Sequence, residues 1–204
     1  MARVFALVED EAGRQTGRGS SFAAVLAYVL RDAGPSTWRG SIRLSLPLTD
    51  AAIEMEHVHR TTHLNAKRSG PRTRRPVLHA VLGWLPSDYA WLTRDHVAET
   101  VQAALRVLGL EAHQAVWVTH TDTGRPHVHI VANLIHPVTG QVARLGLVKK
   151  RMSGFCRAYE ERLGDVRCHK RFAAKAANEN RARLPRSRKV SNKQKASFAP
   201  ASRP

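Results

Sequence analysis

The stretch THTDTGRPHVHIVANLIHP, residues 119–137, concentrates side chains that can bind a metal ion. His120, His127 and His129 fall within ten residues, and Asp122 lies between the first two. Three imidazole ligands leave coordination positions open for water or for an oxygen of a substrate, as catalytic metal sites require. The residue types therefore indicate a catalytic metal site in this segment.

The spacing of these residues predicts a β-hairpin. HQAVWVTH and HVHIVANLIHP both resemble strands, and the Asp, Gly and Pro of TDTGRP predict a loop at residues 121–126. Side chains alternate along a strand, so His127 and His129 share one face, and His120 should lie nearly opposite His127. The other face is uniformly apolar and should contact helices: Val128, Ile130, Ala132 and Leu134.

The pair of histidines alone is weak evidence, because His-x-His is a common pattern. The metal site is predicted because His120, Asp122 and the apolar opposite face accompany the pair. We assign no metal role to the remaining histidines. His57, His59 and His63 fall on one predicted helix, where a solvated face is expected. The other histidines without an assigned metal role are His79, His96, His113, His136 and His169.

The rest of the chain mixes predicted strands with predicted helices. Strands are expected at residues 2–10, 40–48 and 77–86, and helices at residues 22–34, 49–67, 94–109 and 147–164. This pattern predicts an α/β (α+β) sandwich with one mainly antiparallel central sheet. We expect the helices on one face of that sheet and the active site on the other.

Tyr28 lies at the margin of the first predicted helix, about 120° from the centre of its apolar stripe. Its ring can lean on the core while its hydroxyl stays accessible. A tyrosine in this position is commonly a packing residue, so position alone does not identify a nucleophile.

The chain carries 33 Lys and Arg against 16 Asp and Glu, a formal net charge of +17. Residues 166–204 hold twelve of the basic residues and one Glu, about +11, which leaves about +6 for residues 1–165. Such an excess predicts a polyanionic partner, with nucleic acid favoured over an anionic membrane surface. We predict one folded domain at 1–165 and a basic, disordered tail at 166–204.

Nothing in the sequence is typical of secretion or membrane insertion. The N-terminus lacks the long apolar run of a signal peptide, and no segment reaches the roughly 18 apolar residues of a membrane span. Two cysteines do not make a disulfide framework. We therefore expect a cytoplasmic protein.

Three segments together resemble the motifs of relaxases, the nicking enzymes of plasmid mobilisation in the His-hydrophobe-His (HUH) endonuclease superfamily. HTDTGRPHVHIVANLIHP fills the pattern H-x-D-x-x-x-P-H-x-H-x-x-x-N, which is most similar to the P-type mobilisation subgroup. GRGSSFAAVLAYVLRD is similar to the first motif, with Tyr28 in the place of its tyrosine. HAVLGW is similar to the middle motif, H-x-x-x-S followed by an aromatic residue, with Gly83 where serine is expected.

The resemblance covers roughly residues 1–165 and implies site- and strand-specific nicking of DNA at a plasmid transfer origin, for conjugative mobilisation. Tyr28 would form a covalent 5′-phosphotyrosine, and Tyr89 and Tyr159 are weaker candidates. His120, His127 and His129 would hold a divalent metal ion, Mg²⁺ or Mn²⁺, with Zn²⁺, Co²⁺ or Ni²⁺ possible in vitro.

Several points stay open at the level of sequence. Asp122 could orient a ligand histidine or take the proton of the tyrosine. The expected partners are single-stranded or melted origin DNA, accessory relaxosome proteins and a coupling protein. The basic residues expected to contact DNA are Arg18, Arg31, Arg125, Lys149 and Lys150. Two other functions compete with nicking: a non-catalytic origin-binding accessory protein of the same fold, and a metal-dependent phosphohydrolase acting on another substrate.

Overall fold

The structure, a computed structural model, describes residues 18–31, 34, 37–65, 73–122, 124–166 and 169. All of these except residue 169 belong to one compact unit, residues 1–167. The strand expected at residues 2–10 and almost all of the basic tail lie outside the described residues, so both stay predictions. Within the described part, no helix is long and apolar enough to cross a membrane.

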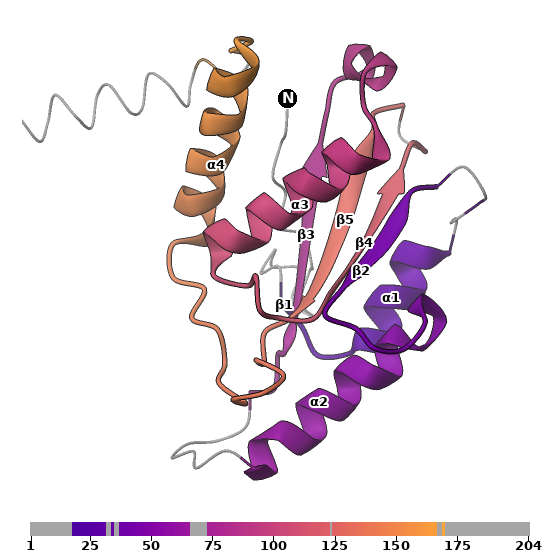
Figure 1. The fold of residues 1–204 in the computed structure, drawn as a ribbon, viewed down its shortest axis with the longest axis vertical. Helices are drawn as coiled ribbons and strands as arrows, with labels where there is room; N and C mark the ends of the chain where they lie inside the picture. The colour runs from indigo at the N-terminus through magenta and orange to yellow at the C-terminus, as the bar shows by residue number, and fades with distance from the viewer. Residues whose placement is uncertain are drawn as a thin grey trace, which may run out of the picture. The chain divides into compact units, whose positions relative to one another are not determined.

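The described strands form a single sheet in which every neighbouring pair is antiparallel (Figure 1). The strand order is β1-β3-β5-β4-β2. The predicted antiparallel sheet is confirmed, and so is the hairpin, because β4 and β5 pair and a short loop joins them. The strands are β1 Arg18–Gly19, β2 Arg39–Ile42, β3 Val77–Gly83, β4 Ala115–His120 and β5 His127–Asn133.

Local sequence signals set the ends of the helices. The side chains of Ser21 and Thr93 accept hydrogen bonds from backbone N–H groups in the first turns of α1 and α3. Gly109 ends α3 with a φ of 73°, a conformation that glycine adopts without strain. The helices are α1 Phe22–Leu30, α2 Ala51–Asn65, α3 Arg94–Leu108 and α4 Val148–Leu163, with short 3-10 turns η1 Leu48–Asp50 and η2 Pro86–Ala90.

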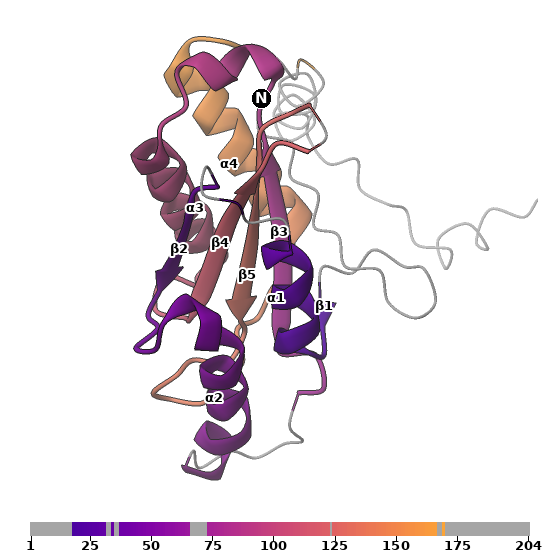
Figure 2. The same cartoon turned by 90° about the vertical axis from the view of Figure 1, so that its right-hand side faces the viewer.

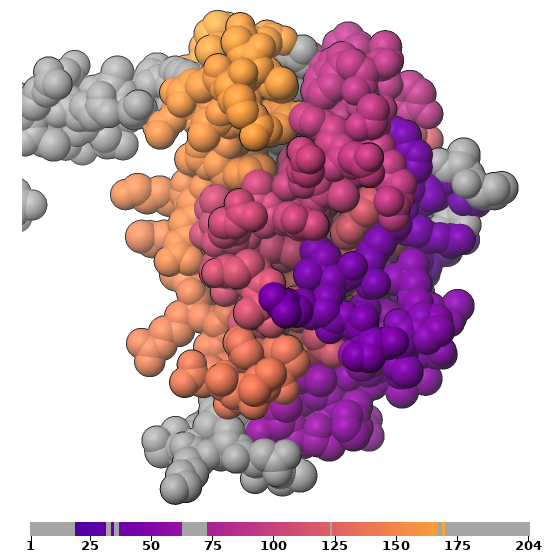
Figure 3. Space-filling view, viewed as in Figure 1, coloured from indigo at the N-terminus to yellow at the C-terminus, as the bar shows by residue number. Residues whose placement is uncertain are grey.

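Helices cover both faces of the sheet. On one face, α3 and α4 pack on the side chains of the strands, and their atoms hide most of the sheet in the space-filling view (Figure 3). Trp117 and Ile130 belong to this core. On the other face, α1 and α2 pack on a second core that includes Val116 and Val131 (Figure 2).

This arrangement corrects the prediction that helices lie on one face only. The predicted apolar side of β5 does contact α3, as expected. The histidine side, however, is polar only towards one end of the sheet, because Val116, Val118 and Val131 lie on it and are fully buried. An apolar surface of this kind must be covered, so α1 and α2 occupy it and leave the histidines at its end.

A close contact between β2 and β4 tests this packing. Gly40 is paired with Trp117, and a Cβ at position 40 would lie 2.7 Å from ring atoms of that buried tryptophan. We predict that Gly40→Ala lowers the free energy of unfolding by about 1–3 kcal/mol, measured by urea denaturation. Gly154→Ala in α4 is the control: its Cβ meets nothing within 4 Å, so roughly 0.5–1 kcal/mol of stabilisation is expected. Equal stability of the two variants would contradict this description of the β2–β4 contact.

Candidate active site

Three histidines meet where β4 ends and β5 begins. His120 is paired directly with His127, as the sequence predicted, and His129 follows two residues later on the same face. One ring nitrogen from each lies within 4.8 Å of the others, and the ring centroids are 4.7–5.6 Å apart. The hairpin thus brings three potential metal ligands to one point.

Backbone carbonyls fix the orientation of two of these rings. His120 Nε2 donates to the carbonyl of Val29 in α1 at 2.7 Å, and His127 Nδ1 donates to the carbonyl of Arg125 at 3.0 Å. A carbonyl only accepts, so the nitrogen facing it carries the proton and the other nitrogen keeps its lone pair. Metal-binding histidines are commonly held in this way by a partner on the second nitrogen.

The third ring has a histidine as its partner. Nδ1 of His129 lies 2.8 Å from Nε2 of His79, and both side chains are buried. If His129 donates, its Nε2 keeps the lone pair and completes a set of three. Sequence alone assigned no role to His79, although this residue begins the HAVLGW motif. Its contact with His129 arises from the pairing of β3 with β5, which no local pattern shows.

The environment keeps His129 neutral. Burial, first, and then the neighbouring His79, His120, His127 and Arg31 together lower the pKa of His129 to about 3. A metal ion binds the neutral imidazole, so near neutral pH no proton would compete with an ion at this ligand.

Tyr28 leans against the buried histidines. Its ring meets those of His129 and His79 edge-on, with centroids 5.9 Å and 6.2 Å apart, while half of the residue remains exposed. The guanidinium carbon of Arg31 lies 4.1 Å from the centre of the Tyr28 ring. This is the position at the helix margin that the sequence predicted.

Asp122 faces the same cluster from the hairpin loop. One carboxylate oxygen lies 3.8 Å from Nε2 of His127, and the other lies 4.0 Å from the guanidinium of Arg31. In neutral His127, Nδ1 carries the proton that it donates to a carbonyl, so Nε2 has a free lone pair. That lone pair and those of the Asp122 oxygen therefore face each other across the 3.8 Å gap. A cation is the natural occupant of such a position. The three imidazoles and this carboxylate therefore fit a divalent metal ion.

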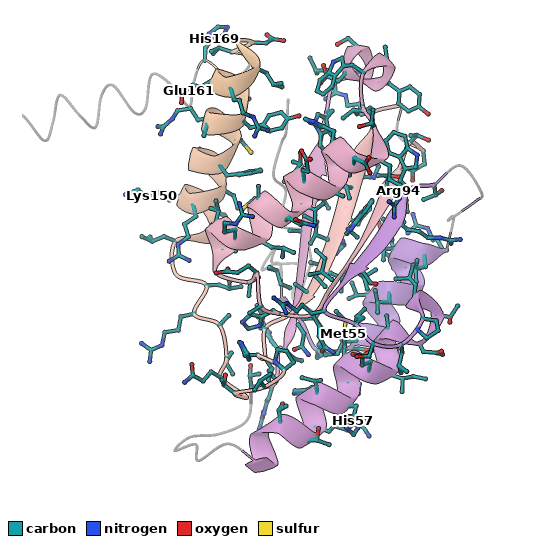
Figure 4. The ribbon with its side chains drawn as sticks, viewed as in Figure 1. Met55, His57, Arg94, Lys150, Glu161 and His169 are labelled. Atoms are coloured by element: carbon teal, nitrogen blue, oxygen red, sulfur yellow. The ribbon has the colours of Figure 1, made fainter. Side chains whose placement is uncertain are left out.

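Other predicted residues are spread over the surface. Arg125 is exposed in the hairpin loop beside the histidines. Lys149 and Lys150 are exposed on α4, and Lys150 points away from the sheet (Figure 4). The side chain of Arg18 lies outside the described part. The contacts of these residues with DNA stay predictions.

The two alternative tyrosines differ from Tyr28. Tyr159 is buried between His96 and Trp84, with hydrogen bonds of 2.7 Å and 2.9 Å at its hydroxyl. Tyr89 is exposed and lies in η2. Tyr28 is the tyrosine whose ring contacts a histidine of the cluster.

Gly83 departs from the expected serine without any crowding that would demand glycine. It is paired with His127, and a Cβ there would lie 3.7 Å from Cβ of that histidine, an ordinary van der Waals distance.

Comparison with known proteins decides the family. A family model described as the nuclease domain of MobA/VirD2-like relaxases matches residues 28–164, from Tyr28 to the end of α4. The chain belongs to this relaxase family. The resemblance seen in the sequence is thereby confirmed at the level of relaxases, and the P-type subgroup stays a prediction.

Two curated proteins are similar to parts of the chain. Protein MobA of Acidithiobacillus ferrooxidans is 31% identical over 74 residues, which cover 36% of this chain and 18% of the relative. Protein TraI of Escherichia coli is 25% identical over 150 residues, which cover 71% of this chain and 19% of the relative. The chain thus spans less than a fifth of the length of either protein. No solved structure matches.

A substitution of His79 tests whether this residue orients the ring of His129 for metal binding. We predict that His79→Ala weakens binding of Mn²⁺ by about 10–100-fold, because His129 loses the partner that orients its ring. Titration calorimetry with the metal alone measures this without any DNA. His113→Ala is the matched control, since His113 is equally buried and binds the carbonyl of Asn133 outside the cluster. Equal affinities in the two variants would contradict a role for His79.

The depressed pKa of His129 makes folding sensitive to acid. Below pH 6.5 the unfolded chain protonates this histidine, whereas the folded chain keeps it neutral down to a pKa of about 3. Stability is therefore lost as the pH falls through this window, by about 1.4 kcal/mol per pH unit for one proton. We predict that His129→Gln reduces the slope of unfolding free energy against pH by that amount between pH 6 and about 4. Urea denaturation of metal-free protein at several pH values measures it.

Burial also lowers the pKa values of His96 and His113, so part of the acid sensitivity should remain in the variant. A slope identical to that of the original chain would mean that His129 titrates normally in the fold.

Proposed function

We propose that this chain nicks one strand of DNA at a plasmid transfer origin, through a covalent bond to Tyr28, during mobilisation. Membership of the relaxase family supports the reaction class. The assignment to Tyr28 depends on one observation. The half-exposed ring of Tyr28 lies edge-on against His129, and His129 is one of the three histidines whose ring nitrogens lie close together. The nucleophile and the charge-stabilising groups are therefore adjacent.

The proposed step is a transesterification. The hydroxyl of Tyr28 releases its proton as its oxygen attacks the phosphorus, the bond from phosphorus to the 3′ oxygen breaks, and the 3′ oxygen leaves and takes up a proton, so the step is neutral in protons. Tyr28 keeps the 5′-phosphate. Because one phosphodiester replaces another, a later 3′-hydroxyl can reverse the step and rejoin the strand.

His120, His127 and His129 are the residues that would hold a divalent ion in this reaction. Such an ion supplies positive charge that polarises the phosphate and offsets the negative charge that grows on it. Family resemblance favours Mg²⁺ or Mn²⁺, whereas imidazole ligands by themselves bind Mn²⁺, Co²⁺ and Zn²⁺ more tightly than Mg²⁺.

Asp122 and two arginines complete the proposed site. The Asp122 carboxylate lies 3.8 Å from His127 and 4.0 Å from Arg31, beside the proposed position of the ion, and its two predicted roles both stay proposals. Arg31 lies over the ring of Tyr28 and can pair with a phosphate oxygen beside the nucleophile. Arg125 offers a second guanidinium from the hairpin loop.

We extend the proposal to the partners. Single-stranded or melted origin DNA is the substrate, with Arg18, Lys149 and Lys150 as further phosphate contacts, and the net charge of +17 supports a polyanionic ligand. Accessory relaxosome proteins and a coupling protein are implied by the family, and the cytoplasm, where plasmid DNA lies, is the proposed location.

The nucleophile is tested by removing one oxygen. We predict that Tyr28→Phe binds single-stranded DNA as tightly as the original chain but forms no adduct that survives denaturant. The assay incubates the full chain, Mn²⁺ and a library of labelled single strands from plasmid origins, then separates protein–DNA adducts on denaturing gels. Tyr159→Phe is the control, because it removes a hydroxyl buried away from the cluster and should keep the adduct.

The competing functions give different results in this assay. An adduct mapped by mass spectrometry to another tyrosine would refute the choice of Tyr28. Origin binding without any adduct would favour an accessory protein, and release of inorganic phosphate from a different substrate would favour a phosphohydrolase.

A further inference from the structure

Arg31 directly follows the last residue of α1 and turns its side chain back over Tyr28. The guanidinium carbon lies 4.1 Å from the centre of the Tyr28 ring, and Nη1 donates to the Tyr28 carbonyl at 2.8 Å. This carbonyl belongs to the last turn of α1, where backbone oxygens lack partners within the helix. The arginine therefore binds both the backbone and the ring of the same tyrosine.

A third contact connects this guanidinium to the hairpin loop. Nη2 of Arg31 lies 4.0 Å from a carboxylate oxygen of Asp122, and both side chains are exposed. An exposed ion pair of this length contributes little to the stability of the fold. Its effect is on direction, because the carboxylate and the Tyr28 carbonyl together favour orientations that keep the guanidinium over the ring.

The ring of Tyr28 is therefore restrained by two kinds of neighbour. Arg31 covers one face, and the rings of His129 and His79 lie at 85° and 70° to it. Half of the tyrosine is exposed, and a side chain in that position can otherwise adopt rotamers that point its hydroxyl in different directions. A cation over an aromatic ring at an exposed site favours one arrangement by roughly two- to fivefold.

We infer that Arg31 is a positioning residue that holds the ring of Tyr28 in the orientation from which its hydroxyl attacks. This role differs from a contact with a phosphate, because it acts on the nucleophile and is present before DNA binds. Attack requires the reacting atoms to be aligned, and a displacement of about 1 Å lowers a rate about 100-fold. The inference rests on the proposed function for the identity of Tyr28 as the nucleophile.

The three contacts require an arginine rather than any cation. A guanidinium is planar and has five N–H donors, so it can lie flat on a ring while its ends bind a carbonyl and a carboxylate. A lysine ammonium is a compact charge on a flexible stem and has no plane to lay on the ring. Arg31→Lys therefore separates the shape of the side chain from its charge.

The orientation of the ring is tested without DNA or metal. The full chain is labelled with fluorotyrosine, so that each of its three tyrosines gives a fluorine NMR signal, and the Tyr28 signal is the one lost in Tyr28→Phe. Arg31→Ala and Arg31→Lys should both shift the Tyr28 signal towards that of the exposed Tyr89. Arg162→Ala is the control, because its guanidinium lies 5.6 Å from the ring of Tyr159 and only the Tyr159 signal should move.

The rate of adduct formation tests whether this orientation matters for attack. Single-turnover rates with an origin strand are measured over a range of DNA concentrations. Mn²⁺ is kept saturating, because the charge of Arg31 also helps to lower the pKa of His129. At saturating DNA, Arg31→Ala and Arg31→Lys should both react about tenfold more slowly, whereas Arg162→Ala should keep the original rate. A residue that only binds a phosphate would instead change the DNA concentration that gives half of the maximal rate.

The outcomes separate this inference from the proposed function. A Tyr28 signal that does not move in Arg31→Ala, or an unchanged rate at saturating DNA, would overturn the inference. Full activity of Arg31→Lys would also overturn it, because charge alone would then suffice. Unchanged signals of Tyr89 and Tyr159 in the Arg31 variants confirm that the fold is intact. If the original chain forms no adduct, the proposed function fails, and the fluorine signals still decide whether Arg31 holds the ring.

Discussion

The hydrogen bond from His120 to the carbonyl of Val29 is the contact on which the proposed site depends. It joins the end of β4 to α1, and Val29 directly follows Tyr28 in the chain. The imidazole therefore serves two elements at once. One nitrogen fixes the helix that carries the proposed nucleophile, and the other belongs to the cluster of potential metal ligands.

The histidine face combines two environments that usually exclude each other. Its middle is an aliphatic core under α1 and α2, and its end carries four imidazoles. Buried imidazoles are costly when charged, and the low pKa of His129 shows that its surroundings favour the neutral form of that ring. Neutral rings held by partners on one nitrogen are prepared ligands, so little reorganisation is needed for an ion to bind.

The sequence predicted what depends on neighbours along the chain. Alternation and turn residues were enough for the β4–β5 hairpin, the pairing of His120 with His127 and the apolar side of β5. The capping threonine and terminal glycine of α3 are equally local signals. Tyr28 required family resemblance as well, since a margin position on a helix is ambiguous.

What the sequence did not predict depends on partners distant in the chain. Alternation shows which residues share a face but not what covers that face, so the helices on the histidine side were missed. Val131, which lies between His129 and Asn133 on the histidine face of β5, could have indicated these helices. A strand with apolar residues on each of its two faces is typically buried on both sides. His79 meets His129 only through the pairing of β3 with β5, fifty residues apart in sequence.

The separation between His120 and Val29, 91 residues, has a consequence for how the site is assembled during folding. The three clustered histidines lie on one hairpin and can approach each other by closing a short loop. The helix with Tyr28 reaches them only when a long loop is closed, at a larger cost in chain entropy. A fragment or partly folded chain can thus gather the imidazoles without the tyrosine. The proposed strand-breaking centre would therefore be complete only after α1 has packed on the sheet, late in the assembly of the fold.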